Sequence, residues 1–446
     1  MSRFLFTTLP SDDLGLLTRS LPIARELKLR GHEVAYCHPA RSPQILIAEG
    51  GFQNLLPDEP LYHMMAATSL RGLLRLLARG KPLRTLKALT RTMKALDRAS
   101  AAEMWNMDQL SFSAIVDTDT LRANVDALTQ LIQSFRADAV VDFWDLRACI
   151  AARILGKPLI TVIQSQQHPK SPGFIWWKDP PRDIPSAAPV INGVLREYGL
   201  PEIKTVGDLF VGDLTLVLGI PELDPLPQTS CVTYIGPVLW QKPEAIVPSW
   251  ITGMTTDKPV VWVYTGTLRY AGKRPTLFDS EIVLKASIEA LSAEDVQVVL
   301  TTGYHELPRS FLPLPGNFRF EPFVPGLAMA KRSNVMIHHG GFGSCQTGIY
   351  VGTPAVIIPT FSERESNARR IVSQRAGEMV LPTSDASGKN KKADPADLAA
   401  KVRKVLSNPS YKENSMRLRA RLLEYGGAQQ AARLIEERVG ANIGHT

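Results

Sequence analysis

The sequence predicts an α/β protein built from two Rossmann-like domains, each with a parallel sheet covered by helices. Two observations support this fold class. Short apolar runs that are typical of buried strands alternate with amphipathic helical patterns over residues 4–163, and the alternation returns over residues 259–359. A proline-rich stretch at residues 221–227 separates the two series. A chain of 446 residues is also long enough to bury two hydrophobic cores.

The first series opens with a strand–helix–strand unit. Residues 4–8 form a short apolar run, and a polar loop with Asp12 and Asp13 follows. The helical pattern after this loop ends at Gly31, and residues 33–36 are the next predicted strand. Strands joined through a helix pair in parallel, so this unit predicts the sheet type of the whole domain.

The remaining elements follow the same alternation. A strand, a helix and a strand are expected at residues 137–142, 146–155 and 159–163. The second series predicts strands at residues 259–264, 296–301, 318–321, 335–338 and 355–359. The expected division is an N-terminal domain (1–236), a linker (237–257), a C-terminal domain (258–425) and a C-terminal helix (426–446) that packs back on the N-terminal domain.

The net charge is concentrated in one segment. Lys and Arg number 51 against 43 Asp and Glu, which gives a formal charge of +8. Residues 71–98 hold nine basic residues and one acidic residue, so the rest of the chain is formally neutral. A nucleic-acid-binding protein with basic residues spread over its surface is therefore disfavoured.

Cysteine spacing and the chain's apolar runs indicate the class of protein. The four cysteines, at positions 37, 149, 231 and 345, form no C-x-x-C pair, which argues against a disulfide framework or a zinc site. The first apolar run is too short for a signal peptide, and no stretch reaches the ~20 apolar residues that span a bilayer. We therefore expect a soluble, cytoplasmic protein.

The most informative segment is a glycine-rich turn after a predicted strand. Residues 335–338 run into Gly340, Gly341 and Gly343, and a helix is expected to start near Ser344. Such a turn presents backbone N–H groups and a helix N-terminus to an anion, and glycine lets the anion approach closely. The phosphates of a nucleotide are the natural ligand of such a site.

Two other interpretations of this turn are open at this point. The glycines can simply permit tight packing between strand and helix. A dinucleotide site is the other interpretation, because Gly341 and Gly343 have its spacing and Glu363 follows 20 residues after Gly343. Against it, Gln346 occupies the position of the third glycine.

A wider set of motifs resembles the donor-binding signature of the UDP-glycosyltransferases, and of their bacterial natural-product members in particular. The signature covers residues 323–367, and weaker resemblance at residues 25–34, 142–158 and 264–267 extends it over nearly the whole chain. The resemblance implies the GT-B fold, in which two such domains face a central cleft. It also implies an inverting, metal-independent hexosyltransferase of secondary metabolism, such as antibiotic biosynthesis. Its donor would be a UDP- or dTDP-sugar and its acceptor a small molecule.

The resemblance implies donor-binding roles for residues of the C-terminal domain. The positions that match the pyrophosphate site are His339, Gly341, Gly343, Ser344, Gly266 and Thr267. Phe323 and Val324 match positions that contact the base, and Glu363 matches the acid that binds sugar hydroxyls. Arg364 stands where the family has glutamine, and it either contacts an acidic sugar or the diphosphate, or pairs with a neighbouring glutamate. For His338 a structural bond to the backbone is expected.

The catalytic base is the main departure from the family, whose histidine at the start of the first helix falls on Leu16. In a first interpretation Asp12 or Asp13 supplies the base, and Pro22 marks a helix that starts late. Either residue can instead be an N-cap. In a second interpretation Asp142 acts directly, because it matches the aspartate that orients the histidine. In a third, a carboxylate or phosphate acceptor needs no base.

The acceptor is expected on the N-terminal domain, where His168 follows a strand and Trp176 lies in an aromatic run. In residues 71–98, leucines recur near helical spacing with basic residues between them, and residues 80–82 divide the pattern into two helices. This surface either attracts an anionic or lipophilic acceptor, or makes a weak contact with an anionic membrane. The alternative is a solvated helical pair that packs on the first domain.

Two functions are therefore compared. The first is the glycosyltransferase just described. The alternative is a catalytically impaired GT-B homologue that binds a nucleotide sugar and activates another transferase as its partner. In both, the nucleotide sugar is a co-substrate, no further cofactor or metal is needed, nucleic acid is not a partner, and a homodimer is compatible with the sequence.

Overall fold

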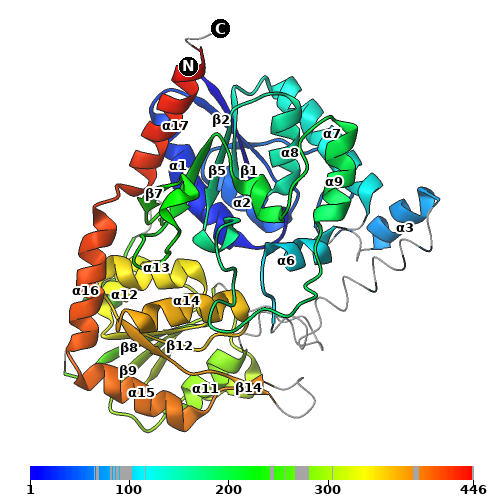
Figure 1. Ribbon diagram of the computed structural model, residues 1–446. Helices are drawn as coiled ribbons and strands as arrows, with labels where there is room; N and C mark the ends of the chain where they lie inside the picture. The colour runs from blue at the N-terminus through cyan, green and yellow to red at the C-terminus, as the bar shows by residue number, and fades with distance from the viewer. Residues whose placement is uncertain are drawn as a thin grey trace. The chain divides into compact units, whose positions relative to one another are not determined.

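The computed structural model describes residues 1–64, 66, 70–80, 83, 86, 90, 103–115, 117–241, 246–255, 257–266, 281–303, 305–384 and 391–443. The chain divides into two compact units (Figure 1). The first unit comprises Met1–Ala95, Trp105–Trp240 and Tyr425–Thr446, and the second comprises Leu96–Met104 and Gln241–Glu424. Each unit is an α/β structure, as the alternation of patterns predicts.

The first unit contains a seven-stranded parallel sheet in the order β3-β2-β1-β4-β5-β6-β7. Its strands are β1 (Arg3–Thr8), β2 (Glu33–Cys37), β3 (Gln53–Asn54), β4 (Ala139–Phe143), β5 (Leu159–Ile163), β6 (Leu214–Leu218) and β7 (Thr233–Gly236). The chain moves outward from β1 to β3 and then returns to place β4 on the other side of β1. This reversal creates a switch point between β1 and β4, where ligands of such folds bind beyond the carboxyl ends of the strands.

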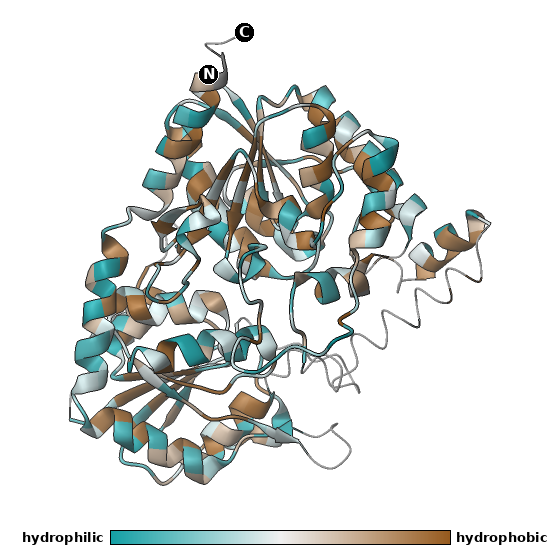
Figure 2. Cartoon of the chain, viewed as in Figure 1, coloured by the Kyte–Doolittle hydropathy of each residue, from teal (hydrophilic) through white to brown (hydrophobic). Residues whose placement is uncertain are grey.

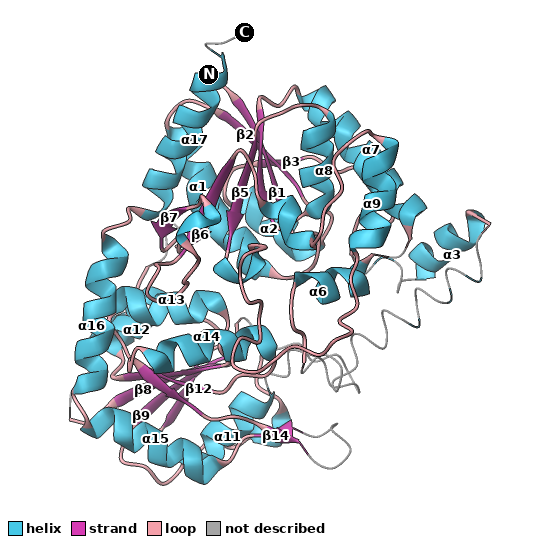
Figure 3. Ribbon diagram, viewed as in Figure 1, coloured by secondary structure: helices cyan, strands magenta, loops and turns pink. Residues whose placement is uncertain are grey.

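Helices cover both faces of this sheet, whereas α3 lies away from it (Figure 3). The helices of this unit are α1 (Leu14–Leu29), α2 (Arg41–Glu49), α3 (Leu70–Ala78), α6 (Met107–Ala114), α7 (Thr118–Phe135), α8 (Leu146–Ile154), α9 (Ala188–Glu197) and α17 (Gly427–Ile443). Short 3₁₀ segments lie at Ser165–Gln167, Val206–Phe210 and Gln228–Ser230. Because helices lie on both faces, the strands read as continuous apolar runs rather than alternating ones.

The start of α1 differs from the expectation of a late helix. The helix begins at Leu14, Asp13 is its N-cap, and Pro22 lies inside it. The Asp13 carboxylate accepts from the Gly15 backbone N–H at 2.6 Å, which satisfies a first-turn donor and fixes the start. Pro22 removes only one interior hydrogen bond, and the buried face of α1 compensates for that loss.

The second unit contains a six-stranded parallel sheet in the order β10-β9-β8-β11-β12-β13. Its strands are β8 (Val260–Tyr264), β9 (Gln297–Thr301), β10 (Phe318–Phe320), β11 (Val335–His338), β12 (Ala355–Ile357) and β13 (Gly377–Met379), and an antiparallel pair forms from β14 (Thr383–Ser384) and β15 (Lys391–Lys392). The helices are α10 (Ser249–Thr252), α11 (Glu281–Leu291), α12 (Gly326–Arg332), α13 (Phe342–Val351), α14 (Ser362–Ser373), α15 (Pro395–Ser407) and α16 (Ser410–Leu423), with a 3₁₀ segment at Arg309–Phe311. The core lies between the sheet and α11 and α15, with apolar side chains such as Val261, Leu284 and Leu398 fully buried.

The last helix, α17, belongs to the first unit and packs along α1 (Figure 1). Glu436 on α17 accepts from Arg30 Nη1 at 2.9 Å and lies 2.8 Å from His32 Nε2, at the amino end of β2. The chain therefore returns to the first unit after completing the second. Among the described residues, no helix is long and apolar enough to cross a membrane.

Candidate functional site

In the second unit, the glycine-rich turn joins β11 to α13. Gly341 is the N-cap of α13, and the helix begins at Phe342, two residues before the expected Ser344. The amides at the start of a helix have no partner within it, so they face outward from the turn. Among the described residues, a side chain added at Gly343 would meet no atom within 4 Å beyond its own helical turn, so these residues leave space next to this first turn. The turn has the geometry of an anion site.

The His339 imidazole explains two of the glycines. A Cβ at Gly266 would lie 2.7 Å from His339 Cε1, and a Cβ at Gly341 would lie 2.5 Å from His339 Nε2. The ring is thus held between two backbone segments that no larger residue can replace. Burial, and then the charge of Arg364, hold the pKa of His339 well below its ordinary value. The imidazole is neutral, so it can donate a hydrogen bond without adding a charge.

His338 has the structural role expected of it. Its side chain is fully buried, and its Nδ1 accepts from the Gly340 backbone N–H at 3.1 Å. Burial lowers the pKa of His338 to about 3, so this ring also stays neutral. Through this hydrogen bond His338 holds the backbone of the turn at Gly340.

The start of α14 brings Glu363 and Arg364 to the glycine turn. Asn367 Nδ2 donates to the Gly340 carbonyl at 3.0 Å and to Glu363 Oε1 at 2.8 Å, which links helix, carboxylate and turn. A Cβ at Gly340 would lie 2.7 Å from the Arg364 carbonyl, so the turn packs closely on α14. The Arg364 guanidinium donates to Thr360 Oγ1 and lies 5.5 Å from the centre of the Phe361 ring.

Phe323 and Val324 lie just before α12, and their side chains differ in how much surface they expose to solvent. Val324 is buried, whereas 47% of Phe323 is exposed, which leaves an aromatic surface on which a base could stack. Ser344 is buried in the first turn of α13. Thr267, the other predicted phosphate contact, lies outside the described residues. In the second unit, the structure thus gathers residues of the predicted donor set around the β11–α13 turn and α14.

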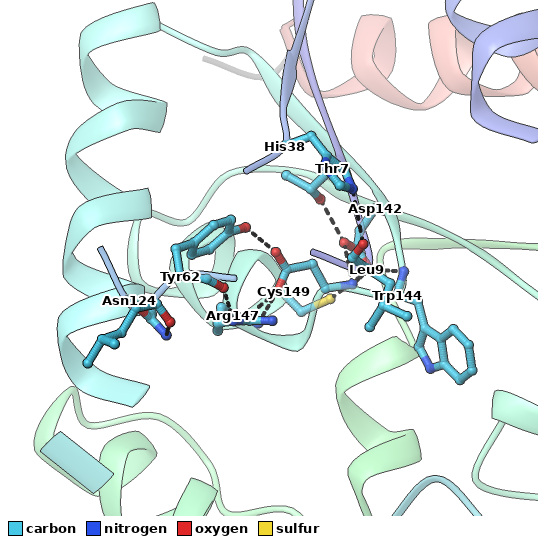
Figure 4. A network of polar contacts seen from close by, with 11 residues as sticks. Thr7, Leu9, His38, Tyr62, Asn124, Asp142, Trp144, Arg147 and Cys149 are labelled. Atoms are coloured by element: carbon cyan, nitrogen blue, oxygen red, sulfur yellow. Dashed lines mark hydrogen bonds and ion pairs between the residues drawn. The ribbon is translucent and has the colours of Figure 1, made fainter. Parts of the chain in front are cut away.

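In the first unit, Asp142 stands at the carboxyl end of β4 beside β1. Thr7 Oγ1 donates to its Oδ1 at 2.6 Å, the Trp144 backbone N–H donates to its Oδ2 at 2.9 Å, and Cys149 Sγ lies 3.3 Å from Oδ2 (Figure 4). Its side chain is fully enclosed. Burial, with the nearby charge of Asp145, raises the pKa of Asp142 to about 7. These contacts fit a group that orders the switch point, because no face of the carboxyl is open to an acceptor.

A second buried carboxylate, Asp145, caps α8 and holds a loop from across the switch point. The Tyr62 hydroxyl donates to Asp145, and Arg147 bridges both residues, donating from Nε to Asp145 Oδ1 at 2.9 Å and from Nη1 to the Tyr62 carbonyl at 2.6 Å (Figure 4). Trp144, between the two aspartates, has a φ of +81°, a conformation rarely found outside glycine. This network fixes residues 59–64 against β4 and α8.

At the start of α1 the structure separates the two neighbouring aspartates. Asp13 is the N-cap, whereas the more exposed Asp12 lies 3.5 Å from His63 Nε2. Leu16, in the position of the family's histidine, is buried. Sequence reasoning missed His63 altogether, because it belongs to no motif and lies 51 positions from Asp12. Only the folded loop brings the pair together.

The two acceptor candidates follow β5 in the first unit. His168 is buried, and its Nδ1 accepts from the Lys170 backbone N–H at 3.1 Å. Burial is the main cause that lowers the pKa of His168. Trp176 is 39% exposed and packs edge-on against Trp177, with ring centres 5.7 Å apart. Trp176 therefore offers an apolar surface, whereas His168 mainly shapes the loop.

No set of three or more His, Cys, Asp or Glu side chains among the described residues could hold a metal ion.

Comparison with known proteins gives a consistent result. Residues 285–436 match the family described as "Erythromycin biosynthesis protein CIII-like, C-terminal domain". The chain is 29% identical to 4'-demethylrebeccamycin synthase of Lentzea aerocolonigenes over 54% of its length and 52% of that protein. It is 26% identical to a PGL/p-HBAD biosynthesis glycosyltransferase of Mycobacterium tuberculosis over 68% of its length and 71% of that protein.

The fold has close counterparts among solved structures. The glycosyltransferase VinC, crystallised in complex with DTDP, superposes with a TM-score of 0.66 at 17% sequence identity, covering 98% of this chain and 100% of the other. At that identity the likeness shows the fold, and this fold is GT-B. The chain thus has the GT-B fold, matches the EryCIII-like C-terminal domain family over residues 285–436, and is similar in sequence to glycosyltransferases of natural-product and glycolipid biosynthesis.

Proposed function

We propose that this protein is an inverting, metal-independent glycosyltransferase that moves a sugar from a UDP- or dTDP-sugar to a small-molecule acceptor in secondary metabolism. The observation that carries the proposal is the start of α13, where the described residues leave space around Gly343 and the neutral His339 ring packs against Gly341. A helix N-terminus and neutral N–H donors can stabilise a leaving diphosphate through electrostatics alone. The VinC structure in complex with DTDP supports a nucleoside diphosphate as ligand.

We assign the donor contacts by chemistry. Gly341 and Gly343 present backbone amides to the diphosphate, and Ser344 presents its hydroxyl, because the Ser344 N–H already donates to the Gly341 carbonyl at 3.0 Å. The exposed Phe323 ring stacks on the base. Glu363, which accepts from Asn367 through Oε1, offers its carboxylate to sugar hydroxyls. Arg364, Val324, Gly266, Thr267 and His339 complete the donor set that the family resemblance implies.

On the acceptor side, Trp176 supplies an apolar platform and His168 shapes the loop beside it. An apolar surface suits a lipophilic aglycone. The carboxylates expected to act as base, Asp13 and Asp142, are engaged as an N-cap and as an enclosed acceptor. Neither carboxylate is therefore placed to take a proton from an acceptor, so replacing either by alanine is expected to act on stability rather than on proton transfer.

The basic segment supports a contact with an anionic lipid surface. On α3, the side chains of Leu70, Leu74 and Leu77 are exposed beside Arg71 and Arg75, whereas Gly72 and Leu76 are buried. Figure 2 shows that much of the α3 ribbon is hydrophobic. An exposed apolar stripe flanked by arginines fits an anionic bilayer. Flotation with phosphatidylserine vesicles, and its loss with phosphatidylcholine or with Leu74→Glu, tests this contact. The homodimer stays a prediction.

Turnover separates the transferase from the activator partner. Isothermal titration with UDP and dTDP tests the donor site, and incubation with UDP- and dTDP-sugars plus a cell extract tests transfer. Glycosylated products exclude a purely non-catalytic role. Tight nucleotide binding without turnover over a broad acceptor panel would overturn the transferase proposal in favour of the partner role.

A further inference from the structure

The helix α3 of the first unit has two faces with different surroundings. One face carries a leucine stripe of Leu70, Leu74 and Leu77, whose side chains are 73%, 58% and 44% exposed. Gly72 and Leu76 are buried. Because an α-helix has about 3.6 residues per turn, these two residues lie on the side opposite to the stripe. The helix therefore has an inner face that packs on the unit and an outer apolar face.

An ion pair joins the inner face to the loop before α3. Arg79, just beyond the end of the helix, continues the inner face, and its Nη2 lies 2.6 Å from Oε2 of Glu59. Only 7% of the Glu59 side chain is exposed, so the pair is largely shielded from water. Arg79 Nη1 also donates to Thr120 Oγ1 on α7 at 3.2 Å. Leu76 packs in a small apolar cluster with Leu61, so the inner face rests on the loop and on α7.

The same loop reaches the carboxyl end of β4. Glu59 Oε1 accepts from the Leu61 backbone N–H at 2.9 Å, so one carboxylate holds both the turn of the loop and Arg79. The next residue, Tyr62, accepts through its carbonyl from Nη1 of Arg147, at the start of α8, at 2.6 Å (Figure 4). Glu59 therefore connects α3 to the polar network at the switch point of the first sheet.

A helix as short as α3 depends on the contacts of its faces. It has nine residues, and an isolated helix of this length is only marginally stable in water. The loop and α7 stabilise it from the inner face, and a surface bound to the leucine stripe would stabilise the same helix from outside. When one partner has already ordered a segment, the second partner binds it at a smaller entropic cost. Two such partners therefore strengthen each other's binding.

We propose that an anionic bilayer on the leucine stripe acts cooperatively with residues 59–62 on the inner face, so that the bilayer regulates the acceptor-side edge of the first unit by holding this loop in place. Arg71 and Arg75 border the stripe, and their charge complements anionic headgroups, which identifies the occupant as a bilayer. The inference rests on the lipid contact of the proposed function and adds a regulatory role to it.

Glu59→Gln tests the cooperativity, because coupling and simple electrostatics predict opposite results. Loss of a negative charge by itself would favour binding to an anionic vesicle. Loss of the pair with Arg79 instead loosens the inner face, and coupling between two sites is reciprocal. Binding to phosphatidylserine vesicles should therefore weaken about fivefold or more, the low end of coupling between linked sites. Unchanged or tighter binding by Glu59→Gln would overturn the proposal.

Matched variants separate this coupling from loss of charge and loss of stability. Glu436→Gln removes the same charge from an ion pair of the same unit, the pair with Arg30, and should bind vesicles at least as well as the wild type. An equal loss in Glu436→Gln and Glu59→Gln would point to general destabilisation and would overturn the coupling. Thr120→Val changes no charge but removes the acceptor on α7 for Arg79, so it should weaken vesicle binding in the same direction as Glu59→Gln.

Hydrogen exchange tests the proposal on the unmodified full chain. The backbone N–H of Tyr62 donates to the Glu59 carbonyl at 3.0 Å, and that of Met64 donates to the Pro10 carbonyl at 2.9 Å, so both amides report whether the loop is docked. Phosphatidylserine vesicles should slow their exchange about fivefold or more relative to phosphatidylcholine vesicles, because reciprocity gives the same factor from either side. The amides of α17 should keep their rates. Unchanged exchange at Tyr62 and Met64, while the chain floats with the anionic vesicles, would refute the coupling.

The remaining outcomes distinguish this inference from the proposed function. Flotation of the wild type without coupling removes only this inference, whereas a wild type that does not float removes the lipid contact itself. Sugar transfer in solution is measured separately, so neither result decides the transferase activity. A dimer in light scattering that Leu74→Glu dissociates, together with no flotation, would assign the leucine stripe to a second copy of the chain and overturn the bilayer as its occupant. Ile45→Glu, at an exposed apolar position of α2, should change neither flotation nor oligomeric state.

Discussion

Gly343→Ala should separate donor binding from stability. Gly343 occupies the first turn of α13, and an added Cβ meets no atom of the described part of the chain within 4 Å outside its own turn. Alanine is a better helix former than glycine by up to about 1 kcal/mol, so the variant should be as stable as the wild type or slightly more stable. The new methyl group nevertheless occupies the space in which we place the diphosphate.

The loss of affinity follows from the contacts displaced. A hydrogen bond from a backbone N–H to a charged phosphate is worth about 1.5–3 kcal/mol. Displacing one such contact should weaken UDP or dTDP binding by about 10–150-fold, since each 1.4 kcal/mol corresponds to tenfold. The larger Gly343→Val should weaken binding further. Gly341→Ala is the contrasting variant, because its Cβ would lie 2.5 Å from His339 Nε2.

The assay pairs isothermal titration with thermal melting. Gly343→Ala should lose affinity at an unchanged or raised Tm, and Gly341→Ala should lose both affinity and Tm. If Gly343→Ala binds UDP and dTDP as the wild type does, the diphosphate does not lie against the start of α13. That result would refute our placement of the donor.

Three further predictions concern single residues. Burial raises the pKa of Asp142 to about 7, so the folded protein holds a proton that the unfolded chain releases near pH 4. This group therefore makes the free energy of unfolding fall as pH rises from about 4 to 7. Asp142→Asn should flatten that slope in urea titrations at a series of pH values, and an unchanged slope would contradict the assignment. Asp13→Ala should cost about 1 kcal/mol of stability through the lost N-cap, measured by urea denaturation, with Ser11→Ala as a loop control. Phe323→Ala should weaken nucleotide binding by roughly 10–100-fold through lost stacking, measured by titration, while a wild-type affinity would exclude the ring from the base site.

Local patterns determined the fold because each strand is short, apolar and covered on both faces. The strands at β1, β5 and β11 lie within one or two residues of their predicted bounds. The predicted starts of helices were wrong where a single N-cap residue determines the first helical residue. The Asp13 cap starts α1 at Leu14 despite Pro22, and Gly341 starts α13 two residues early.

The two halves of the candidate site were predictable to different degrees. The β11–α13 turn could be found because its hydrogen bonds join residues within about 30 positions, from His338 to Asn367, whereas its contact with the distant Gly266 could not. In the first unit, the role of a candidate catalytic side chain could not be predicted from its neighbours in the sequence. Asp142 is a plausible base from its position in the sequence, but only the packing of Thr7, Trp144 and Cys149 around it shows that it is enclosed.

The sequence by itself determined the two α/β units, the glycine turn with its neighbouring histidine, and the confinement of the excess positive charge to residues 71–98. Tertiary structure alone decided that the His339 ring needs Gly266 and Gly341, that α17 returns to α1, and that His63 meets Asp12. The physical reason is the distance along the chain between the residues that determine each property. Strand patterns and turns depend on neighbours along the chain, whereas burial, pairing and the pKa of a side chain depend on residues that only folding brings near.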